Sequence, residues 1–199
     1  MGGTGTLKAV LFDRDGTLVV DVPYNGDPRL VRPMESARSA VARVREAGLA
    51  TGVVSNQSGV ARGLITPAQV EAVNQRVDEL LGPFDVWEFC PHGTEDGCPC
   101  RKPAPGLIHR ACEALGVEPS EVAVIGDIGA DLGAAKAAGA RAVLVPTPVT
   151  REEEIVAADL VANDLWHAVE LLLAVPEDAA LSAGPAVRTG GSPTQGAPA

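Results

Sequence analysis

Two aspartates with a single residue between them follow a short apolar run near the N-terminus. Residues 13–17 read Asp-Arg-Asp-Gly-Thr, and residues 7–12 before them favour a buried strand. Of the carboxylates of Asp13 and Asp15, one could attack phosphorus and form an aspartyl-phosphate. The other could give a proton to the leaving oxygen and then take one from water. A turn built from Asp and Gly without a chemical role is the alternative.

A second acidic pair, Asp127 and Asp131, comes just after the apolar residues 122–126. Four carboxylates at one place would repel each other unless a cation lies between them. Ligands that are all oxygen select a hard cation such as Mg²⁺, which also binds phosphate. The alternative is a helix N-terminus whose macrodipole favours acidic residues. Asp131 could have only that role. Asp127 lies inside the turn, so this alternative explains it less well.

Two further segments could act on a phosphate group. Ser55 begins Ser-Asn-Gln-Ser-Gly at residues 55–59, where its hydroxyl and nearby N–H groups could hold phosphoryl oxygens. Lys102, in Arg-Lys-Pro at residues 101–103, could neutralise the nucleophile and the transferring phosphoryl group. Each segment alone is weak evidence, because such turns and surface Arg-Lys pairs are common.

A compact cluster of soft ligands lies within residues 90–100. Its members are Cys90, His92, Cys98 and Cys100. This set suits tetrahedral Zn²⁺, and four protein ligands leave no open position, so we expect the zinc to be structural. A reactive thiol cluster and a disulfide between two of the cysteines are the alternatives. Cys112 has apolar helical spacing and is expected to be buried.

Strand and helix signals alternate along the chain. Apolar runs predict strands at residues 7–12, 49–54, 84–89, 122–126 and 142–145, with a short edge strand at 160–162. Helices are expected over residues 34–47, 66–81 and 105–116, over an Ala-rich segment that ends at 138, and over 164–175. Thr66, Pro67 and Gln69 form a capping-box pattern. The fold class is therefore α/β, a three-layer Rossmann-like parallel sheet with helices on both faces. Ligands bind such sheets beyond the carboxyl ends of the strands.

Composition restricts the function and the organisation of the chain. With 199 residues we expect one domain over residues 1–175, followed by a disordered tail, rich in Pro, Gly and Ala, at residues 176–199. The net charge of −10 argues against a nucleic-acid or anionic-membrane partner. No apolar run approaches the ~20 residues of a membrane span, and the first six residues lack a signal-peptide layout. We expect a cytoplasmic monomer.

Four segments resemble, in their chain order, the haloacid dehalogenase (HAD) superfamily of phosphatases over roughly residues 7–150: the first acidic pair, the serine segment, the lysine segment and the second acidic pair. The resemblance implies that Asp13 is the nucleophile and Asp15 the general acid/base. It also implies that Ser55 and Lys102 serve as the second-motif hydroxyl and the third-motif lysine. The implied Mg²⁺ ligands are Asp13, the backbone carbonyl of Asp15, and Asp127, with Asp131 in support.

The cysteine segment resembles one branch of this superfamily, which carries zinc and lacks a cap domain. That branch contains phosphatases of D-glycero-D-manno-heptose 1,7-bisphosphate and of histidinol phosphate, and residues 55–63 resemble it too. The insertions at residues 18–32 and 90–101 are too short for a folded cap. We expect Asn56 and Arg101 to bind the substrate. Arg101 is expected to contact a second phosphate of that substrate. Ile128 stands where the branch commonly has a basic residue.

This resemblance implies hydrolysis of the 7-phosphate of heptose bisphosphate. The alternatives are a phosphatase of histidinol phosphate or of another small phosphorylated metabolite, and a zinc-stabilised binding protein with an inactive site. A phosphotransferase that uses the same aspartyl-phosphate, with a sugar rather than water as the acceptor, is a further alternative.

Overall fold

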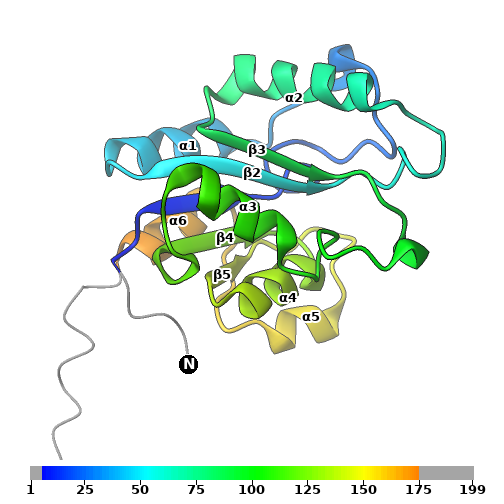
Figure 1. The fold of residues 1–199 in the computed structure, drawn as a ribbon. Helices are drawn as coiled ribbons and strands as arrows, with labels where there is room; N and C mark the ends of the chain where they lie inside the picture. Colours follow the sequence, from blue (N-terminus) through cyan, green and yellow to red (C-terminus); the bar gives the residue numbers. More distant parts are fainter. Residues whose placement is uncertain (1–5, 175–199) are drawn as a thin grey trace, which may run out of the picture.

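A five-stranded parallel sheet forms the centre of the computed structural model, which describes residues 6–174. The strand order is β3-β2-β1-β4-β5, and every neighbouring pair is parallel (Figure 1). The strands are β1 (Ala9–Phe12), β2 (Ala50–Asn56), β3 (Val86–Cys90), β4 (Val122–Gly126) and β5 (Arg141–Leu144). The order reverses beside β1, so the switch point of the sheet lies next to the strand that leads to Asp13.

Helices cover both faces of the sheet (Figure 1). They are α1 (Ala37–Glu46), α2 (Pro67–Leu81), α3 (Gly106–Leu115), α4 (Gly129–Ala138), α5 (Glu152–Ala157) and α6 (Leu165–Leu173). One core packs α1, α2 and α6 against Val10 and Phe12, whereas the other packs α3 and α4 against Ala9 and Leu11. Successive side chains of β1 therefore alternate between two cores, as a strand covered on both faces requires. The predicted three-layer fold is confirmed.

Helix α2 begins where the capping-box pattern predicts. The Thr66 hydroxyl accepts a hydrogen bond from the Gln69 N–H (3.2 Å), and the Gln69 side chain accepts one from the Thr66 N–H (2.9 Å). The buried stripe of the helix contains Val70, Val73 and Val77. One polar residue, Asn74, lies on the same stripe and is 8 % exposed.

The structure departs from the predicted elements in two places. Residues 160–162 form a single bridge, between Leu144 and Val161, rather than a strand. Helix α5 was not predicted, because it begins with three glutamates and offers no apolar spacing. The expected tail at residues 176–199 lies outside the described residues.

The carboxyl edge of the sheet has no folded cap within residues 6–174. The segment between β1 and α1 contains only the short 3₁₀ turn Pro28–Leu30, and the segment between β3 and α3 contains only Thr94–Asp96. Among the described helices, none is long and apolar enough to cross a membrane.

Candidate active site

The ends of three adjacent strands bring the predicted phosphate-handling residues together. Asp13 directly follows β1, Ser55 lies near the end of β2, and Asp127 directly follows β4. Since Phe12 is in register with Val53 on one side and Ile125 on the other, these side chains meet at one edge. All three are buried, at 7 %, 3 % and 5 % exposure. The sheet therefore builds one polar site from segments far apart in the sequence.

Lys102 is the cation of this site. Its ammonium group donates to Oδ1 of Asp13, to Oδ1 of Asp131 (2.5 Å) and to the Val54 carbonyl (2.9 Å), which uses all three of its protons. The residue is 3 % exposed. Burial lowers the pKa of Lys102, but the charges of Asp13 and Asp131 outweigh burial and hold that pKa above its ordinary value. Lys102 therefore remains charged at neutral pH.

Three buried carboxylates surround this single ammonium group. Oxygens of Asp13, Asp127 and Asp131 all lie within 4.8 Å of one another. Burial raises the pKa of Asp13 to about 8 although Lys102 opposes the rise, and Asp131 adds to it. Burial and Asp131 raise the pKa of Asp127 to about 6. Because one ammonium cannot balance three carboxylates, a further cation is needed to keep them ionised, and an oxygen-only donor set fits Mg²⁺.

Close backbone packing holds Asp127 in this cluster. Gly16 has φ +84°, and a Cβ there would collide with Oδ2 of Asp127. The loop after β5 adds two hydroxyl groups: Thr150 donates to the Asp127 backbone carbonyl (2.6 Å), and Thr147 lies 3.4 Å from its Oδ2. The Asp-Gly-Thr turn and the loop after β5 thus support the same carboxylate from two sides.

Asp15 and Ser55 share a hydrogen-bonding partner that sequence reasoning missed. The Gln57 side-chain amide donates to Oδ2 of Asp15 and to the Ser55 hydroxyl, each at 2.8 Å. Oδ2 of Asp15 also accepts from Arg14. Gln57 lies within the segment of residues 55–59, but nothing in the sequence alone distinguishes its amide from that of its neighbour Asn56.

Asn56 holds the backbone of Lys102. Its amide oxygen accepts from the Lys102 N–H (3.0 Å), and its amide nitrogen donates to the Lys102 carbonyl (3.1 Å). This reciprocal pair links the end of β2 to the loop before α3. The expected role of Asn56 in substrate binding stays a prediction; the contacts of its amide are with the Lys102 backbone.

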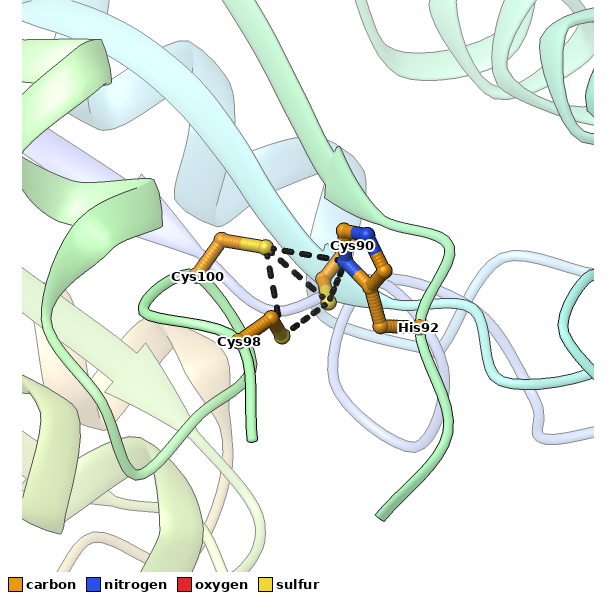
Figure 2. A group of neighbouring side chains, drawn as sticks. All are labelled: Cys90, His92, Cys98 and Cys100. Atoms are coloured by element: carbon orange, nitrogen blue, oxygen red, sulfur yellow. Dashed lines mark hydrogen bonds between the residues drawn. The ribbon is translucent and has the colours of Figure 1, made fainter. Parts of the chain in front are cut away.

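Figure 2 shows the Cys90, His92, Cys98 and Cys100 side chains converging on one another. The sulfurs lie 3.3–3.6 Å apart, and Nδ1 of His92 lies 3.5 Å from the Cys90 sulfur and 3.2 Å from the Cys100 sulfur. A tetrahedral zinc site with Zn–S near 2.3 Å has S–S edges of about 3.8 Å. The four donors therefore form a slightly contracted tetrahedron, which fits a zinc ion.

The cluster contains no disulfide, since its three cysteines are free, as is Cys112. Burial raises the pKa of Cys98, but N–H groups of Arg101 and Cys100 outweigh burial and lower it to about 7. A thiol with a lowered pKa is more readily a thiolate, the form that ligates metals, whereas burial raises the pKa of Cys90 in the same cluster to about 12. Cys112 lies on α3 and is buried in the core, as predicted.

The cysteine cluster adjoins the carboxylate site. The Gln57 N–H donates to the Cys90 carbonyl (2.7 Å), so the loop after β2 rests on the end of β3. Cys100 precedes the Arg101–Lys102 pair directly. Whatever fixes the four ligands therefore also fixes the backbone that carries Lys102 into the site.

The fold and this site together define a HAD-like hydrolase. A model of the HAD-hydrolase-like family matches residues 99–168. The D-glycero-beta-D-manno-heptose-1,7-bisphosphate 7-phosphatase of Pseudomonas aeruginosa is 39 % identical over 143 residues, covering 69 % of this chain and 80 % of that protein. Its counterpart in Escherichia coli K12 is 36 % identical over 174 residues, covering 80 % and 91 %.

A solved structure agrees with the sequence relatives. The D,D-heptose 1,7-bisphosphate phosphatase of B. bronchiseptica, complexed with magnesium and phosphate, superposes with a TM-score of 0.73 at 31 % identity. The match covers 84 % of this chain and 98 % of that one. The chain therefore belongs to the HAD-like phosphatase family that contains these heptose bisphosphate enzymes.

Replacing Gly16 by Ala should reduce phosphatase activity by about 10²-fold, because the new methyl group displaces Asp127 and small displacements at a reacting centre are costly. Steady-state kinetics with saturating Mg²⁺ measures the effect. Gly139→Ala is the matched control: its φ is +83°, and no atom lies within 4 Å of the added Cβ. Both variants lose stability through backbone strain, but only Gly16→Ala should lose activity. Equal activities would contradict the packing argument.

Proposed function

We propose that this chain removes the 7-phosphate of D-glycero-D-manno-heptose 1,7-bisphosphate, with Asp13 as the nucleophile. The observation that carries the proposal is the contact of Asp13 with Lys102, beside Asp127 and Asp131, at the carboxyl edge of the sheet. The substrate is inferred from relatives that are 34–39 % identical and bear that name. Histidinol phosphate or another small phosphorylated metabolite is the alternative substrate.

The reaction divides between two carboxylates. Asp13 attacks phosphorus as the bond to the sugar oxygen breaks, and Asp15 gives that oxygen a proton. Water then attacks the aspartyl-phosphate while Asp15 takes its proton, which releases phosphate and restores Asp13. Lys102 offsets charge on the nucleophile and the phosphoryl group throughout. Ser55, whose hydroxyl accepts a hydrogen bond from Gln57, is oriented to donate its own proton to a phosphoryl oxygen.

Two metals complete the proposal. Asp13, the backbone carbonyl of Asp15 and Asp127 would hold Mg²⁺, with Asp131 in support. When bound, Mg²⁺ supplies positive charge that keeps the carboxylates ionised and offsets the phosphate charge. Cys90, His92, Cys98 and Cys100 would hold a structural Zn²⁺.

Arg101 is proposed to bind the substrate away from the phosphate that is transferred. It adjoins Lys102 in sequence, and its Nη1 is buried without a hydrogen-bond partner among the described residues. A buried donor of this kind is costly unless it is satisfied by a ligand. Because Ile128 carries no charge, we propose Arg101 as the cation that takes a second phosphate. We also propose that the enzyme is a cytoplasmic monomer, in keeping with its free cysteines.

A panel of phosphate esters with Mg²⁺ tests the proposed activity, including both heptose bisphosphate anomers and histidinol phosphate. Heptose bisphosphate should have the highest kcat/KM, and the product should retain its 1-phosphate. Asp13→Asn keeps the shape but is a poor nucleophile, so it should lose at least about 10³-fold in rate. Full activity in Asp13→Asn would overturn the mechanism. A higher kcat/KM for histidinol phosphate than for heptose bisphosphate would overturn the proposed substrate assignment.

Replacing Arg101 by Ala should raise KM for the bisphosphate by about tenfold or more, because hydrogen bonds to charged groups contribute about 1.5–3 kcal/mol. KM for a sugar monophosphate should change much less. Arg76→Ala, which removes an exposed arginine paired with Glu79 on α2, serves as the control. Equal effects of Arg101→Ala on both esters would refute the second-phosphate role.

Elemental analysis should find one zinc per chain in the purified protein. Chelation should lower both thermal stability and activity, because the cluster orients the backbone of Lys102. Cys98→Ala should lose the zinc, whereas Cys112→Ala, which removes a cysteine outside the cluster, should keep it. A zinc-free protein of unchanged stability would contradict the structural role.

A further inference from the structure

Arg14 is a buried charged residue for which the mechanism above has no use. It stands between the two aspartates of the Asp-Arg-Asp motif and is 1 % exposed. Burying a guanidinium group is unfavourable unless its N–H donors are satisfied. A side chain that pointed into solvent at position 14 would avoid this cost of burial. The contacts of Arg14 therefore indicate what it does.

The guanidinium group joins Asp15 to helix α2. Nε and Nη2 donate to Oδ2 of Asp15, at 3.1 and 2.9 Å. Nη1 donates to Oδ1 of Asn74, at 2.6 Å. Asn74 is the polar residue on the otherwise apolar stripe of α2, so the core itself anchors the far end of the guanidinium. Arg14 is consequently held at both ends and cannot follow Asp15 if that side chain turns away.

The donors to Asp15 all converge on one of its two oxygens. Oδ2 accepts from Nε and Nη2 of Arg14 and from the Gln57 amide at 2.8 Å. Among residues 6–174, none donates a hydrogen bond to Oδ1. A proton on Oδ2 would point at three N–H groups and would break these contacts. Oδ1 is therefore the oxygen left free to hold a proton when Asp15 acts as the general acid.

We propose that Arg14, anchored by Asn74, is a positioning residue that directs Oδ1 of Asp15 toward the scissile ester oxygen. The inference rests on the proposed function. In the first step the proton moves from Oδ1 to the ester oxygen as its bond to phosphorus breaks and the Asp13–phosphorus bond forms. In the second step the oxygen of a water molecule bonds to phosphorus as the bond between Asp13 and phosphorus breaks, and Oδ1 takes a proton from that water. Oδ2 stays with Arg14 and Gln57 in both steps.

The choice of leaving group distinguishes a positioning role of Arg14 from a merely structural role. A sugar alkoxide must be protonated as it leaves, whereas p-nitrophenolate is a stable anion and needs no proton. The constant kcat/KM reports the first step, transfer to Asp13, so the later role of Asp15 toward water does not enter. A misplaced Asp15 should therefore lower kcat/KM for the sugar ester more than kcat/KM for p-nitrophenyl phosphate.

Arg14→Met keeps the length of the side chain and removes its donors. Its kcat/KM for heptose bisphosphate or another alkyl phosphate should fall by about 10²-fold, within the range of general acid catalysis. Its kcat/KM for p-nitrophenyl phosphate should fall far less. Asn74→Leu, which leaves Arg14 in place but frees its far end, should show the same selectivity with a smaller loss. Circular dichroism and thermal unfolding check that both variants fold.

Arg43→Met is the matched control, because Arg43 forms an ion pair with Glu170 between α1 and α6, away from the site. It should leave both esters unaffected. Equal losses on the two esters in a folded Asn74→Leu or Arg14→Met, or no loss on either, would overturn the inference while leaving the proposed function intact. A wild-type enzyme inactive on both esters would overturn the proposed function and this inference with it.

Discussion

The ammonium group of Lys102 is the contact on which the site depends. It lies 3 % exposed between Asp13 and Asp131 and also donates to the Val54 carbonyl. A buried cation of this kind is tolerated only when its charge is paired and its protons are all used. The same contacts tie together the ends of β1 and β2, the start of α4 and the loop before α3. Removing Lys102 would leave Asp13 and Asp131 buried without their counter-charge, so these four segments have to be positioned together.

The rest of the fold can be understood as the means of bringing Lys102 to this place. Parallel strands with fully buried faces deliver Asp13 and Asp127 to one edge. Lys102 comes from the loop between β3 and α3, whose one regular element is the short 3₁₀ turn Thr94–Asp96. It is held by the Asn56 amide and by the neighbouring cysteine cluster. A metal in that cluster would give a short, open loop the rigidity that a cap domain or a longer core would otherwise supply. Structural and catalytic parts of the chain are thus adjacent by necessity.

Much of this arrangement could be predicted from the sequence, because each element has strong local signals. The apolar runs before Asp13 and Asp127 locate the strands, and a capping box locates the start of α2. Topology then brings the motifs together, since parallel strands share a carboxyl edge. The contacts between side chains could not be predicted from the sequence. Gln57 and Asn56 are similar amides in one loop, yet Gln57 binds Asp15 and Asn56 binds Lys102. Asn74 did leave a signal, because it is a polar residue on an apolar helical stripe. Thr147 and Thr150 left none, because their loop has no pattern that points to Asp127.

The central claim is that Asp13 itself becomes phosphorylated. The most direct measurement is to quench the enzyme with acid during turnover, reduce it with borohydride and map its peptides by mass spectrometry. Borohydride converts an aspartyl-phosphate to homoserine, so the account predicts homoserine at position 13 only when substrate is present. Homoserine at another acidic residue, or none anywhere while phosphate is being released, would contradict it.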